Sequence, residues 1–273
     1  MSTLIAPEAL GGAYHRLDAR MGPSAHDAYR EAHLEGAHFV DVERDLTGDA
    51  SDPAKGGRHP LPPLKRWCET LGKLGVGPET EVVVYDDAGG AKAAARAWWM
   101  LRAVGHEAVW VLDGGLQGAV DAGARLIPDV PTRLPKGAYP ATEWTLPTVT
   151  LEQIEARLAA ERGCLVDVRA KARYDGLEEP LDPEPGHIPG AINVPLERNL
   201  AEGGRFARRG ALRALYTDAL GDAAIEDVVV SCGSGITACH TLLALEHAGF
   251  KGASLYVGSY SEWSRSGRRV ARA

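Results

Sequence analysis

The sequence of 273 residues contains no run of about 18 apolar residues, so it predicts no transmembrane helix. Its first dozen residues lack the basic start and apolar middle of a signal peptide, and we therefore expect a cytoplasmic protein. Basic residues are fewer than acidic ones: the sequence has 30 Lys and Arg and 37 Asp and Glu, for a net charge of -7. Binding to nucleic acid or to an anionic membrane favours a basic surface, so neither is an expected partner.

Cysteine is scarce as well, with four in the chain. They form no Cys-x-x-Cys pair and no zinc-like spacing with the nine histidines, which argues against a disulfide framework and a metal site. Nothing in the sequence implies an organic cofactor. The simplest interpretation is one chemically active cysteine among small core residues, and Cys68 and Cys164 fit that core role.

What the sequence does contain is a repeat with a period of about 150 residues, which suits two copies of one domain. Asp18 in Leu-Asp-Ala-Arg corresponds to Asp167 in Val-Asp-Val-Arg, and the apolar run 82–85 corresponds to 228–231. A proline-rich stretch without helical pattern separates the copies. We expect a first domain at 1–130, a linker at 131–147 and a second domain at 148–273.

Within each half, short β-branched runs alternate with amphipathic helical patterns. Such alternation predicts an α/β fold in which helices cover both faces of a mostly parallel sheet. For the second half, the pattern predicts strands at 165–168, 228–231 and 254–257 and helices at 151–160, 211–220 and 238–248.

Cys232 is the candidate nucleophile, because it follows a predicted strand and precedes a predicted helix. Ligands on parallel sheets lie at the carboxyl ends of strands, and a helix N-terminus together with loop N–H groups stabilises a thiolate. Glycines let the loop backbone curl with its N–H groups inward, and hydroxyls add donors. The candidate loop residues after the cysteine are Gly233, Ser234, Gly235, Ile236 and Thr237.

The same cradle would hold a persulfide, whose outer sulfur is also negatively charged. This favours a double displacement in which a donor gives sulfur to Cys232 and an acceptor then removes it. Cysteine phosphatases and arsenate reductases share the architecture, but they place an arginine at the sixth residue after the nucleophile. That position is Ala238 here, which argues against a phosphatase.

The loop Cys-Gly-Ser-Gly-Ile-Thr-Ala and the overall order of motifs resemble the tandem-domain rhodaneses, the thiosulfate and 3-mercaptopyruvate sulfurtransferases. The resemblance implies two rhodanese-like domains, each with a five-stranded, mostly parallel sheet flanked by helices, and a catalytic second domain. It implies an inactive first domain, since Asp86 stands where the repeat would place a cysteine. The supporting motifs are Gly186–Ala191, Trp98–Met100, Leu112–Gly115 and Gly258–Trp263.

The resemblance also implies roles for single residues. Ser234 would act with the nucleophile, and Arg173 would bind the anionic donor, which a guanidinium suits. Glu43 and His59, both from the first domain, would line the substrate pocket. Arg169, in the Asp-x-Arg motif, is expected to be structural, tying the sheet to a neighbouring loop.

The donor stays open between thiosulfate and 3-mercaptopyruvate. Mercaptopyruvate enzymes of the family place a second arginine after a Glu-Pro pair, whereas Leu181 and Asp182 follow Glu179-Pro180 here. Losing a charge-assisted bond to the donor would weaken its binding by roughly tenfold to a hundredfold. A redox role for Cys239, two helical turns beyond Cys232, also stays open, with a core role favoured because the two lie about 10 Å apart along a helix.

By analogy with the family, the acceptor would be a thiol such as thioredoxin, or cyanide. The competing interpretation is a non-catalytic persulfide carrier or regulatory module, loaded at Cys232 by a partner protein. A carrier needs an open mouth, whereas an enzyme for small donors needs a basic, enclosed pocket. The combination of Arg173 with Glu43 and His59 favours the enzyme.

Overall fold

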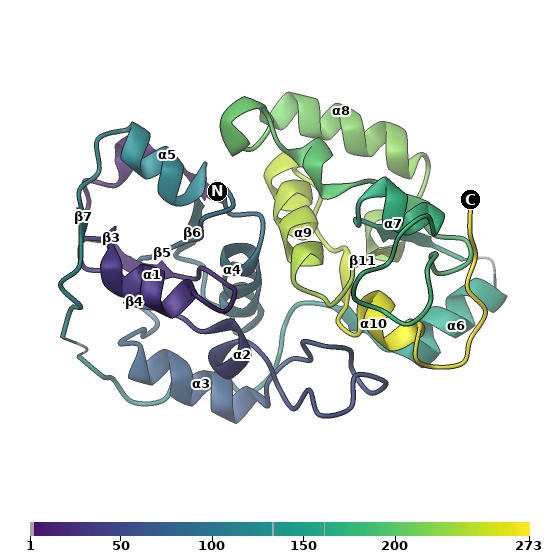
Figure 1. The fold of residues 1–273 in the computed structure, drawn as a ribbon, viewed down its shortest axis with the longest axis horizontal. Coiled ribbons are helices and arrows are strands. Elements are labelled where there is room, and N and C mark those ends of the chain that lie inside the picture. The colour runs from purple at the N-terminus through teal and green to yellow at the C-terminus, as the bar shows by residue number, and fades with distance from the viewer. Residues whose placement is uncertain (1–2, 133, 161) are drawn as a thin grey trace. The chain divides into compact units, whose positions relative to one another are not determined.

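The computed structural model describes residues 3–132, 134–160 and 162–273. The chain divides into two compact units, each built around a sheet (Figure 1). The first unit takes the chain up to Thr47, then Pro62–Thr145 and Ala201–Phe206. The second takes Gly48–Leu61, Leu146–Leu200 and Ala207–Ala273.

The sheet of the first unit has five parallel strands in the order β1-β6-β5-β2-β4. Its central strand is a run of three valines and a tyrosine buried on both faces, as a parallel sheet covered by helices requires. A short antiparallel pair, β3-β7, belongs to the same unit. The strands are β1 (Leu4–Ile5), β2 (His15–Asp18), β3 (His33–Leu34), β4 (His38–Phe39), β5 (Val82–Tyr85), β6 (Val109–Leu112) and β7 (Leu126–Ile127).

The sheet of the second unit is also five-stranded and parallel, in the order β10-β9-β11-β12-β8. Taken from its other edge, this order matches the first sheet strand for strand, so the repeat in the sequence is a repeat of topology. The strands are β8 (Thr148–Val149), β9 (Cys164–Asp167), β10 (Ile192–Asn193), β11 (Val228–Ser231) and β12 (Ser254–Tyr256).

Helices and short 3-10 turns connect the strands. In the first unit, α4 packs against β5 and β6; in the second, α9 packs against β11 and β12, and α8 packs on α9. The first unit contains η1 (Pro7–Ala9), α1 (Ala25–Glu31), α2 (Val42–Asp45), α3 (Leu64–Lys73), α4 (Ala93–Ala103), α5 (Gly115–Asp121) and η3 (Glu202–Gly204). The second contains α6 (Leu151–Ala159), α7 (Lys171–Asp175), η2 (Leu196–Asn199), α8 (Arg209–Leu220), η4 (Ile225–Asp227), α9 (Thr237–Ala248) and α10 (Ser259–Trp263).

Local sequence explains where the helices begin and end. Thr150 caps α6 through a capping box: its Oγ1 accepts from the Gln153 N–H at 3.3 Å, and the Gln153 side chain accepts from the Thr150 N–H at 2.8 Å. Gly249 ends α9 in a left-handed conformation, with φ at +96°. The predicted strands and helices of the second half are confirmed to within two residues at each end. None of the helices in the described part of the chain is long and apolar enough to cross a membrane.

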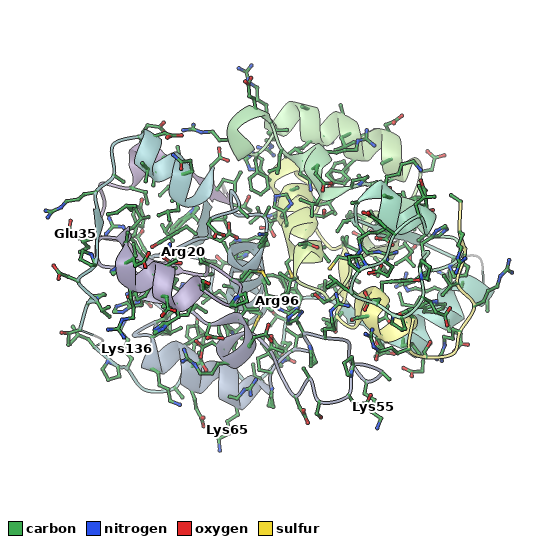
Figure 2. The ribbon with its side chains drawn as sticks, in the orientation of Figure 1. Arg20, Glu35, Lys55, Lys65, Arg96 and Lys136 are labelled. Atoms are coloured by element: carbon green, nitrogen blue, oxygen red, sulfur yellow. The ribbon has the colours of Figure 1, made fainter. Side chains whose placement is uncertain are left out.

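The Asp-x-Arg landmarks of the repeat are matching buried ion pairs. Arg20 Nη2 donates to Asp18 Oδ2 at 2.8 Å (Arg20 is labelled in Figure 2), and Arg169 Nη2 donates to Asp167 Oδ2 at 2.6 Å. Each arginine also bonds a backbone carbonyl, that of Ala32 in the first unit and that of Gly186 in the second. Each pair therefore ties the end of a strand to a loop of its own unit.

The stretch predicted as a linker has no helix in its described residues, 131–132 and 134–147. It is hydrogen-bonded to the first unit: the N–H groups of Lys136 and Tyr139 donate to the carbonyls of Gly72 and Cys68, at 2.8 and 2.9 Å. The domain bounds 1–130, 131–147 and 148–273 stay a prediction. The compact units differ from a linear division, because Gly48–Leu61 joins the second unit and Ala201–Phe206 joins the first.

A polar network is buried under α8 and α9 in the second unit. The Asn199 side-chain nitrogen donates to Thr241 Oγ1 at 3.1 Å and lies 3.4 Å from His240 Nδ1, while the Tyr216 hydroxyl donates to the Asn199 carbonyl oxygen. Burial lowers the pKa of His240 to about 3. His240 therefore stays uncharged in the folded chain at neutral pH.

This buried ring makes stability depend on pH. In the unfolded chain His240 has a pKa of 6.5 and is protonated below that pH, whereas in the folded chain it stays neutral. The free energy of unfolding therefore falls as the pH drops below about 6.5. We expect His240→Gln to lose this contribution, which reaches about 1.4 kcal/mol per pH unit. Urea unfolding of parent and variant between pH 7 and pH 5 measures it, and identical pH slopes in the two proteins would contradict the assignment.

Candidate active site

Cys232 lies directly after β11, the central strand of the second sheet, and the loop that it opens leads into α9. This is the carboxyl end of the sheet, where parallel α/β folds bind ligands. The residue is 1% exposed, so its sulfur lies within the loop rather than on the surface. Helix α9 begins at Thr237 and is 12 residues long, so its N-terminus adds a favourable potential for an anion.

Two backbone N–H groups of the loop converge on the cysteine sulfur. Gly235 donates to Sγ at 3.0 Å and Ser234 donates at 3.4 Å. The chain turns back in this way because Gly235 has φ at +80°, in the left-handed region, and a Cβ there would lie 2.4 Å from the Val257 carbonyl oxygen. Two N–H groups of the loop therefore lie on the sulfur, and glycine is required at the turn between them.

Ser259 is a neighbour of Cys232 that the sequence analysis did not assign to the site. Its Oγ accepts from the Cys232 N–H at 3.2 Å and lies 3.9 Å from Sγ. Ser259 is fully buried at the start of α10, just after β12, and its φ is +52°. The sequence feature that could have indicated Ser259 is its position after β12, the strand paired with β11. The carboxyl ends of paired parallel strands lie at the same edge of the sheet.

Arg173 extends from α7 into a cluster of charged groups. Its Nη2 donates to Glu179 Oε1 at 2.6 Å and lies 3.4 Å from Asp182 Oδ2. Both carboxylates are almost completely buried, whereas the arginine is 17% exposed. The guanidinium is therefore held by two buried carboxylates on a side chain that is itself partly exposed.

Arg58 belongs to the same cluster, although it is more than 100 residues away in sequence. It comes from Gly48–Leu61, which packs within the second unit, and its Nη1 pairs with Asp182. The point that a Cβ would occupy on Gly233 lies 3.1 Å from Arg58 Nη2 and 3.5 Å from Arg173 Nη1. Two guanidinium groups therefore lie beside the residue that follows the cysteine.

The other predicted site residues have varied positions. It is the backbone N–H of Ser234 that donates to the sulfur, while Ile236 is buried and Thr237 is the first residue of α9. His59 follows Arg58 in the segment that joins the second unit, and it is partly buried. Glu43 lies in α2 of the first unit, so its place in the site stays a prediction.

Arg169 has the structural role expected for it. It bonds both oxygens of Asp167, Glu179 Oε2 at 3.1 Å and the Gly186 carbonyl at 2.7 Å, and its guanidinium lies 3.7 Å from the centre of the Tyr260 ring. With all these partners and a side chain 1% exposed, it orients Glu179 rather than meeting a donor.

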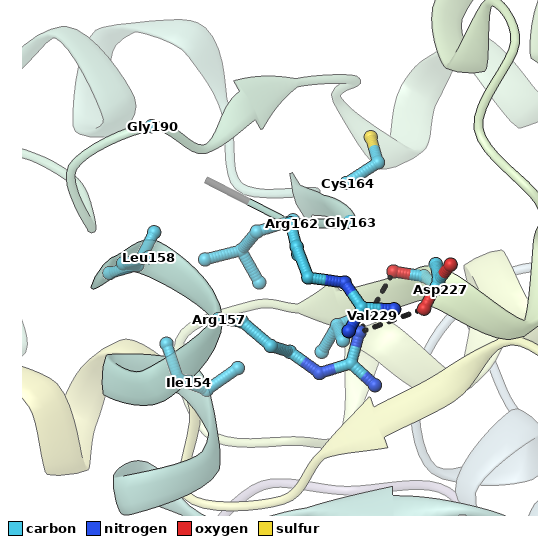
Figure 3. A pocket seen from close by; sticks show the side chains of 10 residues that line it. Ile154, Arg157, Leu158, Arg162, Gly163, Cys164, Gly190, Asp227 and Val229 are labelled. Atoms are coloured by element: carbon cyan, nitrogen blue, oxygen red, sulfur yellow. Dashed lines mark hydrogen bonds and ion pairs between the residues drawn. The ribbon is translucent and has the colours of Figure 1, made fainter. Parts of the chain in front are cut away.

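The other three cysteines are not placed for this chemistry. Cys239 is fully buried and its Sγ donates to the Gly235 carbonyl at 3.3 Å, as a core residue behind the loop would. Cys164 borders a cavity of about 280 Å³ with Arg157 and Leu158 (Figure 3). That cavity lies at the amino ends of β9 and β11, opposite the Cys232 loop, and burial raises the pKa of the Cys164 thiol, as it does for Cys68.

The equivalent loop of the first unit, after β5, holds the Asp86 side chain where the second unit has Cys232. The Asp86 side chain accepts from the N–H groups of Ala88, Gly90, Lys92 and Ala94 at 2.8 to 3.1 Å. Burial raises the pKa of Asp86, and these four donors act in the opposite direction. The N–H groups of this loop are therefore occupied by the side chain of Asp86, a residue of the loop itself.

These features define an α/β protein with two copies of one fold, in which two backbone N–H groups of one loop converge on the sulfur of Cys232. The model of the rhodanese-like domain matches residues 8–122 and 150–266. The chain belongs to the rhodanese-like family, with two tandem copies of the domain.

Known relatives extend along most of the chain. It is 36% identical over 273 residues to 3-mercaptopyruvate sulfurtransferase of Homo sapiens, covering 95% of this chain and 88% of the relative. It is 35% identical over 245 residues to thiosulfate sulfurtransferase of Rattus norvegicus, covering 88% and 80%. The crystal structure of the 3-mercaptopyruvate sulfotransferase SseA from Escherichia coli is 30% identical in sequence with a TM-score of 0.79, covering 95% of this chain and 99% of that one.

The turn at Gly235 can be tested directly. We expect Gly235→Ala to slow alkylation of Cys232 by iodoacetamide at least tenfold at neutral pH, because the added Cβ forces the N–H groups away from the sulfur. Gly210→Ala is the matched control, since a Cβ there meets nothing within 4 Å. A rate for Gly235→Ala within twofold of the control would show that the cradle does not activate the thiol.

Proposed function

We propose that this chain is a sulfurtransferase that moves a sulfane sulfur through a persulfide on Cys232. The observation that carries the proposal is the convergence of the Ser234 and Gly235 N–H groups on the Cys232 sulfur. Both N–H groups, with the N-terminus of α9 behind them, stabilise a negative charge on sulfur. The nucleophile needs that charge before transfer, and the persulfide carries it afterwards.

The first half-reaction loads the cysteine. The Cys232 thiolate attacks the outer sulfur of thiosulfate, the S–S bond of the donor breaks, and its electron pair leaves with sulfite. With 3-mercaptopyruvate, the C–S bond breaks instead, and the carbon takes the electron pair and then a proton to give pyruvate. In both cases one neutral sulfur is added to the thiolate, which becomes Cys-S-S⁻.

The second half-reaction unloads it. An acceptor thiolate or cyanide attacks the outer sulfur, the S–S bond of the persulfide breaks, and the electron pair returns to Cys232. The products are an acceptor persulfide or thiocyanate together with the original thiolate. The N–H groups stabilise the leaving thiolate in this step, and so act in both directions.

The donors that we propose are thiosulfate and 3-mercaptopyruvate, which give the relatives above their names. Both are anions whose oxygens suit a guanidinium. Arg173 is held by Glu179 close to the cysteine loop and stays partly exposed, so it is proposed to bind the donor. For the acceptor we propose cyanide or a thiol such as that of thioredoxin.

The nucleophile is tested by Cys232→Ser. We expect the parent, incubated with thiosulfate or 3-mercaptopyruvate, to gain one sulfur atom in its mass and to form thiocyanate from cyanide. The serine variant should lose both by at least a thousandfold, because a serine hydroxyl at neutral pH is not ionised. Cys164→Ser is the control, since that thiol lies at the other end of the sheet and should leave both signals unchanged.

Two outcomes would contradict the proposal. Turnover that survives in Cys232→Ser would mean that the nucleophile lies elsewhere. A parent that turns over neither donor, yet gains one sulfur when treated with a cysteine desulfurase and its substrate, would be a persulfide carrier loaded by a partner protein.

A further inference from the structure

The sequence places an acidic residue where mercaptopyruvate enzymes of the family carry a second arginine. Asp182 follows Glu179-Pro180-Leu181, and its side chain is completely buried. A buried carboxylate is stable only with partners, because desolvation of an unpaired charge costs several kcal/mol. Its partners therefore indicate what the chain has put in place of the missing cation.

Asp182 holds three arginines from three parts of the chain. It pairs with Arg58, with Arg265 Nη1 at 2.7 Å, and with Arg173 Nη2 at 3.4 Å. Arg265 also donates to the Ser261 carbonyl at 2.8 Å. Position 182 thus carries no cation itself, but its carboxylate binds three arginine side chains from other segments.

Arg58 is fixed at both its backbone and its side chain. Its N–H donates to Ser261 Oγ at 3.0 Å, and the preceding segment is bound by the Gly56 N–H, which donates to Glu262 Oε1 at 2.7 Å. Its Nη1 is engaged by Asp182, while Nη2 lies beside Gly233 and the side chain is 22% exposed. The guanidinium of Arg58 is therefore oriented in the absence of a donor, with Nη2 beside the cysteine loop.

The balance of charge leaves the cluster positive. Its carboxylates are Asp167, Glu179 and Asp182, and its guanidinium groups are those of Arg58, Arg169, Arg173 and Arg265. Four cations against three anions leave one positive charge in excess, next to a loop that already favours an anion. The two cations on the side of Gly233 are Arg58 and Arg173.

We propose that Arg58 is the second donor-binding cation of this protein, pairing with Arg173 to hold the anionic group of the donor beside Gly233. Asp182 anchors Arg58 from behind and so takes part in recognition without meeting the donor. The identity of the donor rests on the proposed function. What is new here is that Arg58 binds an anion next to Cys232.

Anion recognition can be measured without sulfur transfer, by alkylating Cys232. Iodoacetate carries a carboxylate where iodoacetamide carries a neutral amide, so the ratio of their rate constants reports the binding of the anion. We expect Arg58→Ala to lower this ratio at least tenfold, with the iodoacetamide rate within about threefold of the parent. Arg58→Lys should lie between the two, because it keeps the charge and loses the fork.

One variant serves as the control. Lys55→Ala removes one positive charge from the same segment, but its side chain is 85% exposed and paired with Asp52 (Lys55 is labelled in Figure 2). It should keep the ratio within about twofold of the parent. An equal fall in Arg58→Ala and Lys55→Ala, or no fall in Arg58→Ala, would overturn the proposal.

Steady-state kinetics complete the test in the full-length chain. Arg58→Ala should raise KM for thiosulfate and 3-mercaptopyruvate at least tenfold and change kcat by less than about threefold. If the parent transfers no sulfur, the proposed function fails while the alkylation ratio still decides the role of Arg58. If turnover is normal and the ratio does not respond, Arg58 is removed from the site and the sulfurtransferase stands.

Discussion

The proposed chemistry of this protein depends on one turn of backbone, in which the residues after Cys232 fold back until two N–H groups meet its sulfur. The turn needs a left-handed residue packed against the Val257 carbonyl, and only glycine satisfies both conditions at position 235. It also needs a rigid support, which β11 provides as the central strand of a sheet with neighbours on both sides. Ser259, Arg58 and Arg173 are held around this fixed point.

Much of the fold could be predicted because its information is local. Runs of three valines indicate buried strands, Thr150 and Gly249 mark helix ends, and the order of these signals is repeated in both halves. Cys232 could be proposed as the nucleophile for the same reason, since strand, cysteine, glycines and helix are contiguous. The exchange of Gly48–Leu61 and Ala201–Phe206 between units was not, because neither segment has a regular pattern.

The charged cluster around Asp182 could not be predicted from local sequence patterns. The partners of Asp182 lie 124, 9 and 83 residues away along the chain, at Arg58, Arg173 and Arg265. The family resemblance indicated Arg173, but it gave no role to Arg58 or Arg265, and Asp182 suggested the loss of a cation. Only the folded chain shows that an acidic residue can supply positive charge to a site indirectly, by fixing the arginines that surround it.

The Asp86 loop gives the duplication a consequence of its own. A site for the proposed sulfur transfer must hold an anion through a cycle in which sulfur atoms arrive and leave, whereas the loop of the first unit is filled by a covalently attached carboxyl group that accepts from four N–H groups. The two copies of the domain thus use equivalent loops differently. In the second copy the loop N–H groups surround the Cys232 sulfur, and in the first they surround the Asp86 side chain, so the loop keeps its N–H donors paired without a cysteine.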